Sequence, residues 1–254
     1  MNSPSGKRRL VVKDKLWNGL HFCLRSLLPI SVFLIVAFLA VPALAYVLIL
    51  LSKWRILAAK PRFWWPNLRA NAADLAFSFS LVLFMGWPSA DLTQQLIWLA
   101  IYLLWVFVFK TDRLPAGHVW RGLAAQGMGA AALIYSLNQL PLPAVLAGIW
   151  LVSLIAVQHI LSGFPKRDYH SRLTQIWGLF AIQLAWVMLH WQVNFWIIPN
   201  LAVLLAVVLL ASSLLYSLHL REAAHGAARR QILASTLIVT FAVLIFSGLW
   251  LTTL

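Results

Sequence analysis

Long apolar runs separated by short polar connectors dominate the chain. The runs are 15 to 25 residues long, close to the helix length that crosses about 30 Å of hydrocarbon. A chain inside a bilayer must satisfy its own backbone hydrogen bonds, and these runs lack the alternating polarity of barrel strands, so we predict helices. The expected membrane segments are residues 27–51, 72–87, 95–109, 122–138, 144–162, 175–190, 196–218 and 232–254.

These segments predict an all-α fold, a polytopic transmembrane helical bundle. Seven helices are expected to cross the membrane, and the first segment is expected to be a re-entrant or eighth membrane segment. Residues 1–26 form a basic amphipathic N-terminal segment, in which leucines recur at helical spacing from Leu16 to Leu27, as in an interfacial helix. Residues 27–254 are expected to form a single transmembrane domain.

The composition supports a membrane protein over a soluble one. Hydrophobic residues make up 62% of the chain and charged residues only 10%, against about 25% charged in ordinary soluble domains. The fourteen tryptophans are typical of the aromatic belts at membrane interfaces. Cys23 is the only cysteine, which excludes an internal disulfide and a cysteine metal cluster.

The chain carries 20 Lys and Arg against 6 Asp and Glu, a net charge of +14. In a soluble protein this excess would suggest nucleic acid. Here the bases lie in short connectors, where we expect them to set orientation and to meet the anionic headgroups of membrane lipids. We therefore expect membrane lipids as partners, together with a membrane-protein partner or a second copy of the chain, and no nucleic acid.

Basic connectors alternate with connectors that hold no bases, which predicts orientation by the positive-inside rule. Five bases lie in 52–71 and three each in 110–121, 163–174 and 219–231, whereas 88–94, 139–143 and 191–195 have none. We predict that the basic connectors are cytoplasmic and that the C-terminus lies outside, in a bacterial cytoplasmic (inner) membrane. Both flanks of segment 27–51 are basic, so this segment either turns back near Pro42 as a hairpin or crosses as a full span.

The stretch between the first two apolar segments combines bases, tryptophans and prolines before an acid. We expect it to bend along the cytoplasmic surface, and the alternatives are an anchoring loop or a site for an anionic headgroup or phosphate-bearing substrate. Asp74, inside the next helix, is either a proton or cation site or a structural ion pair with Arg69 or Arg121. The candidate binding residues are Lys60, Arg62, Trp64, Trp65, Arg69 and Asp74.

Few other polar residues lie inside the predicted spans. Gln183 and His190 share one face of segment 175–190, and with His159 they are candidates for a polar path. The alternative is ordinary hydrogen bonding between helices. Segment 122–138 carries Gln126 and three glycines among many alanines, which predicts close helix packing.

No catalytic or cofactor motif is present, and no metal site or cofactor is expected. The first functional hypothesis is transport or flipping of a small or lipid-linked anion, motivated by the basic face above Asp74. The alternatives are a non-catalytic subunit or scaffold of a membrane complex, and a lipid-modifying intramembrane enzyme that uses His159 or His190. The sequence favours a protein that is not an enzyme.

Overall fold

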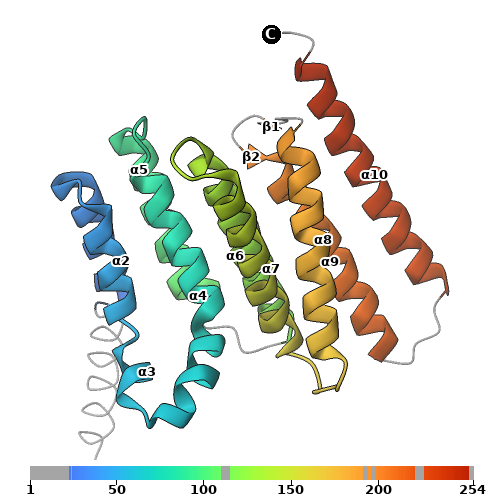
Figure 1. The fold of residues 1–254 in the computed structure, drawn as a ribbon, viewed down its shortest axis with the longest axis horizontal. Helices are drawn as coiled ribbons and strands as arrows, with labels where there is room; N and C mark the ends of the chain where they lie inside the picture. Colours follow the sequence, from blue (N-terminus) through green and yellow to red (C-terminus); the bar gives the residue numbers. More distant parts are fainter. Residues whose placement is uncertain are drawn as a thin grey trace, which may run out of the picture. The chain divides into compact units, whose positions relative to one another are not determined.

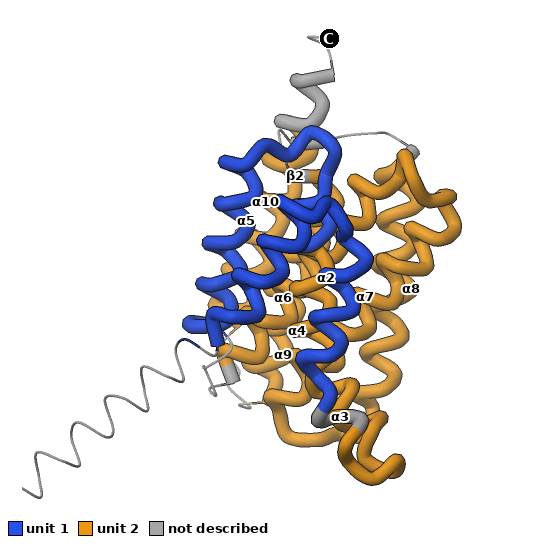
Figure 2. The backbone as a smooth tube through the Cα atoms, turned by 90° about the vertical axis from the view of Figure 1, so that its left-hand side faces the viewer, with its two compact units in different colours: residues 1–55, 82–111 blue, residues 56–81, 112–254 orange. Residues whose placement is uncertain are grey.

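The protein is described from a computed structural model, which covers Cys23 and residues 25–109, 115–190, 194–195, 198–220 and 226–251. Most of the predicted N-terminal segment 1–26 lies outside these residues. The chain divides into two compact units, residues 1–55 with 82–111 and residues 56–81 with 112–254 (Figure 2). The prediction of a single transmembrane domain stays a prediction.

The first unit begins with two short helices where the sequence predicts one long segment. Helix Arg25–Leu39 ends in the π-helical turn η1, Ile35–Leu39, and α2 follows as Pro42–Leu51. Between them Ala40 adopts a left-handed conformation with φ of 52°, and Pro42 stands at the first turn of α2, where a missing N–H is harmless. The chain reverses here into a helical hairpin (Figure 1). Its helices, about 22 and 15 Å long, are shorter than the hydrocarbon layer, and whether the hairpin re-enters the membrane stays a prediction.

The same unit contains the last turn of α4 and the following helix. Helix α5 spans Leu92–Leu104 and continues as η3, Trp105–Phe109. Asp91 caps α5 by accepting a hydrogen bond from the backbone N–H of Gln94 at 2.7 Å, which satisfies one of the free N–H groups of a helix start. Phe84, in the last turn of α4, stacks on Trp98 of α5 with ring centroids 4.6 Å apart, so aromatic packing holds this turn against α5.

The second unit contains the other helices. Short helices α3 (Trp54–Ala58), whose first two residues belong to the first unit, and η2 (Pro61–Phe63) come before α4. Helix α4 spans Trp64–Met85, and its last four residues also belong to the first unit. The larger helices are α6 (Pro115–Tyr135, followed by η4 at Ser136–Asn138), α7 (Leu142–Leu161), α8 (His170–His190), α9 (Asn200–Leu220) and α10 (Gly226–Leu251). Strands β1 (Asn194–Phe195) and β2 (Ile198–Pro199) pair as a small antiparallel hairpin between α8 and α9.

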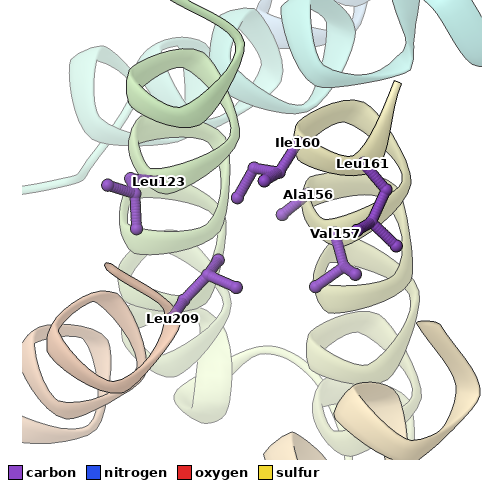
Figure 3. Packing of buried hydrophobic residues seen from close by; sticks show 6 residues of the cluster. All are labelled: Leu123, Ala156, Val157, Ile160, Leu161 and Leu209. Atoms are coloured by element: carbon purple, nitrogen blue, oxygen red, sulfur yellow. The ribbon is translucent and has the colours of Figure 1, made fainter. Parts of the chain in front are cut away.

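Helices α6 to α9 form the packed centre of this unit. Helix α6 packs against α7 and α9, and α7 also packs against α8. Figure 3 shows the apolar cluster at the α6, α7 and α9 contacts, which joins Leu123 of α6 and Leu209 of α9 to residues of α7 that include Ala156 and Ile160. A Cβ atom added to Gly122 would lie 2.8 Å from the carbonyl oxygen of Ala156. Small residues therefore let α6 and α7 approach closely, as the sequence predicts.

Six described helices are long and apolar enough to cross a membrane, which indicates a multi-pass membrane protein. They include α4 with η2, α5 with η3, and α7 to α10. Helix α6, the counterpart of predicted segment 122–138, has 21 residues but is less apolar, because Arg121, Gln126 and several glycines interrupt it. The predicted count of seven crossings therefore stays a prediction. Within the second unit, the base-rich connector 163–169 and the first turns of α6 and α10 lie at one end (Figure 1).

Candidate functional site

Two histidines meet where the start of α6 lies beside the end of α7. The rings of His118 and His159 stack with centroids 5.0 Å apart and an interplanar angle of 30°. The hydroxyl of Ser162 lies 3.3 Å from Nδ1 of His118 and donates to the carbonyl oxygen of His159 at 2.6 Å. A Cβ atom on Gly163 would lie 2.9 Å from the Cβ of His118, so close packing fixes this imidazole in place.

His159 is the unusual member of the pair. Its side chain is only 9% exposed, and its Nε2 atom has no hydrogen-bond partner among the described residues. A buried polar atom of this kind costs free energy unless a ligand, a water or an ion completes its bonding. Asp74 of α4 and Arg121 of α6 both lie close enough to act on this imidazole electrostatically. The site thus combines two imidazoles, a guanidinium and a carboxylate inside helices of membrane-spanning length.

A second buried polar side chain, that of Gln126, links helices α6, α7 and α8. The fully buried amide of Gln126 in α6 donates from Nε2 to the hydroxyl of Ser153 in α7 at 3.3 Å. Its Oε1 accepts a hydrogen bond from the indole N–H of Trp177 in α8 at 3.2 Å. Each side chain has a partner on a neighbouring helix, so this network fixes the register of α6, α7 and α8.

A third polar cluster lies where α8 begins and α9 ends. Nε2 of His170 is 2.6 Å from the hydroxyl of Tyr216, which also donates to the hydroxyl of Tyr169 at 3.5 Å. The guanidinium of Arg167, in the connector before α8, acts electrostatically on both His170 and Tyr216. These groups form a polar rim at the basic end of the unit.

The predicted basic and aromatic stretch lies on the surface. Among its members, Lys60, Arg62, Trp64, Trp65 and Arg69 are all exposed. The guanidinium of Arg62 lies 4.7 Å from the ring centroid of Phe63, and that of Arg69 lies 5.3 Å from the ring centroid of Trp65. The indole of Trp64 donates to the carbonyl oxygen of Ala59 at 2.8 Å, so the segment is held mainly by local contacts. Its binding of a headgroup stays a prediction.

The predicted polar path is not brought together by the described residues. Gln183 is exposed on α8, whereas His159 is buried against α6. His190 ends α8, and its side chain lies outside the described part. Of the residues predicted from sequence, Asp74 and His159 lie close enough in the structure for the Asp74 carboxylate to act electrostatically on the His159 imidazole.

Sequence reasoning did not identify His118, Ser162 or Tyr216 as site residues. A signal was present for the histidines, because His118 and His170 each follow a charged connector just before a predicted span. The partners of these histidines lie on other helices, and the spacing of residues along one helix does not reveal such contacts. Among the described residues, no group of three His, Cys, Asp or Glu could hold a metal ion.

No protein-family model, curated protein or solved structure is similar enough to this chain to indicate a family.

Proposed function

We propose that this multi-pass membrane protein transports or flips a small or lipid-linked anion, with the site around His159 at the centre of the mechanism. The observation that supports this function best is the unpartnered Nε2 atom of a nine-tenths buried imidazole. Ionisable groups within membrane helices are costly, and they commonly mark substrate or proton pathways. An imidazole N–H and the nearby Arg121 suit an anionic oxygen, and Asp74 supplies a carboxylate that can balance or release the charge.

The experiment compares two adjacent residues of α7 in proteoliposomes. His159→Leu removes the buried imidazole, whereas the control Gln158→Leu places the same side chain at an exposed position. Two probes are used, fluorescent phosphatidylglycerol to follow flipping and radioactive inorganic phosphate to follow uptake. We expect the wild type and Gln158→Leu to move one of the probes. His159→Leu and Asp74→Asn should lower its rate by about tenfold or more, the loss expected when about 1.4 kcal/mol of binding to the moving ion is removed.

Thermal unfolding in detergent accompanies each transport measurement, so that a misfolded variant is recognised. Full activity of Asp74→Asn would remove Asp74 from the mechanism. If the wild-type protein moves neither probe faster than empty liposomes, this function is wrong.

Helix α10 favours a second candidate, a subunit of a membrane complex. None of the residues in its membrane-spanning window is buried, and among the described elements it packs mainly against α9. A stable partner recovered with the full chain in mild detergent, and lost in a chain truncated before residue 226, would support this candidate. A single band in that preparation would argue against it.

A further inference from the structure

A groove with a volume of about 350 Å³ lies between the ends of α7, α8 and α9. It exists because α8 packs closely on α7 but touches α9 at few residues. Val157 of α7 and Leu209 of α9, both visible in Figure 3, belong to its wall. The volume falls in the range of about 300 to 1,000 Å³ that is typical of ligand pockets.

The wall of the groove is apolar because its few polar side chains are already paired within the protein. The hydroxyl of Ser212 donates to the carbonyl oxygen of Val208 at 2.8 Å, and that of Ser213 donates to the carbonyl oxygen of Leu209 at 2.7 Å. The indole N–H of Trp177 is bonded to Gln126. A polar ligand would therefore find few partners along the wall, whereas an alkyl chain needs none.

One end of the groove is polar and basic. Tyr216 is the lining residue nearest the end of α9, and its hydroxyl is bonded to His170. Arg167 acts on both of these residues, and Lys166 is exposed beside it. An apolar channel that ends at cationic and hydroxyl groups complements an amphiphile with an anionic head.

The length of the groove matches one leaflet. Its lining residues on α9 run from Val208 to Tyr216, which corresponds to about 12 Å of helix. This length is less than half of a hydrocarbon core of about 30 Å. A chain seated in the groove would therefore come from the leaflet that borders the basic end of the unit.

We propose that this groove binds one acyl chain of an anionic phospholipid from that leaflet, with the headgroup held near Arg167, His170 and Tyr216. The site is separate from the His118 and His159 pair, and it does not require that the protein transports anything.

Photo-crosslinking tests this site directly. The full chain is reconstituted in phosphatidylcholine vesicles that contain a small fraction of phosphatidylglycerol with a diazirine in its acyl chain. Peptide mapping of the wild type should place the label on groove residues such as Leu173, Ile176 and Val208. Labelling spread evenly over the outer faces of all helices, or absent from the groove, would overturn the proposal, since the groove would then be an ordinary lipid-facing surface or be covered by protein.

A matched pair of variants on α9 separates groove filling from general damage. Ser212→Phe places a ring in the groove, whereas Ser217→Phe makes the same change at a position outside the lining residues. We expect Ser212→Phe to reduce labelling of the groove peptides to background and Ser217→Phe to leave it unchanged. Equal labelling in both variants, with unchanged thermal unfolding, would contradict the site.

The headgroup preference is tested by a second pair of variants. Arg167→Gln should lower the labelling ratio of phosphatidylglycerol to phosphatidylcholine probes by about fivefold, because one base near an anionic headgroup contributes about this factor in affinity. Arg230→Gln, an exposed base on α10, should leave the ratio unchanged. Equal labelling by both probes in the wild type would overturn the choice of an anionic lipid.

Discussion

The boundary between α6 and α7 and the boundary between α8 and α9 differ in what fills them. Between α6 and α7, glycines lie against Ala156 and Val152 so closely that added Cβ atoms would meet them at 2.8 Å or less. Between α8 and α9 the side chains are larger, among them Trp177, Phe180 and Tyr216, and a groove remains. Small side chains thus bring helices together, whereas large ones keep them apart and leave space.

The two boundaries also differ in where their polar side chains lie. The close boundary buries Gln126, Ser153 and His159, whereas the contacts of Tyr216 with His170 and Tyr169 lie at one end of the open boundary. In a membrane the gain from close contact between helices is packing and hydrogen bonding, because lipid tails are as apolar as the side chains they replace. An interior site for polar chemistry therefore belongs to the close boundary, and a site for an alkyl chain belongs to the open one.

The largest expected effect comes from breaking the close boundary at Gly122. Gly122→Leu forces a side chain against Ile160 and the carbonyl oxygen of Ala156, and overpacking of this kind costs about 3 kcal/mol. The free energy of unfolding, measured by denaturant titration in detergent micelles, should fall accordingly. The control is Gly127→Leu, because no atom lies within 4 Å of an added Cβ there. Equal losses in both variants would mean that close packing is not what distinguishes this boundary.

A smaller effect is expected at the buried amide. Gln126→Leu removes the bond to Ser153 and leaves the indole of Trp177 without its acceptor, at a cost of about 1 kcal/mol, since hydrogen bonds between membrane helices average somewhat less than this. Combining it with Trp177→Phe tests the pair by a double-mutant cycle in the same unfolding assay. Strict additivity of the two losses would show that the amide and the indole are not coupled.

The smallest effect is expected at the open boundary. Tyr216→Phe removes the 2.6 Å contact with His170, and its partial exposure limits the loss to about 0.5 kcal/mol of unfolding free energy. Tyr169→Phe removes only the 3.5 Å bond and should cost less. A loss at Tyr216 as large as that at Gly122 would remove the contrast between the two boundaries.

Most of the helices were predictable from hydrophobic patterning. The predicted segments 144–162 and 196–218 match α7 and α9 to within four residues, because an apolar run of bilayer length favours a helix that satisfies its own backbone hydrogen bonds. Helix α10 begins six residues before the predicted segment 232–254. The helices start earlier than predicted at the basic end, as at Trp64, Pro115 and His170. Polar residues in the first turns of a helix lower its hydropathy without preventing its backbone hydrogen bonds.

The site was predictable only in part. Asp74 and His159 were candidates because ionisable residues are rare inside apolar helices. Their proximity to His118 and Arg121 depends on how α4, α6 and α7 pack, and no spacing along one helix reveals that. Gln183 was a candidate because it shares one face of the predicted segment with His190, and the structure places its side chain at an exposed position on α8.

By itself the sequence determined that the chain is a set of apolar helices, with bases gathered in alternate connectors, because hydropathy and charge act on each segment separately. Only the tertiary structure decided which polar side chains are buried, which find partners, and where two helices separate to leave a groove. Those outcomes depend on how side chains of different sizes pack between helices that are distant in sequence. The pattern of one segment does not show which other segment it packs against.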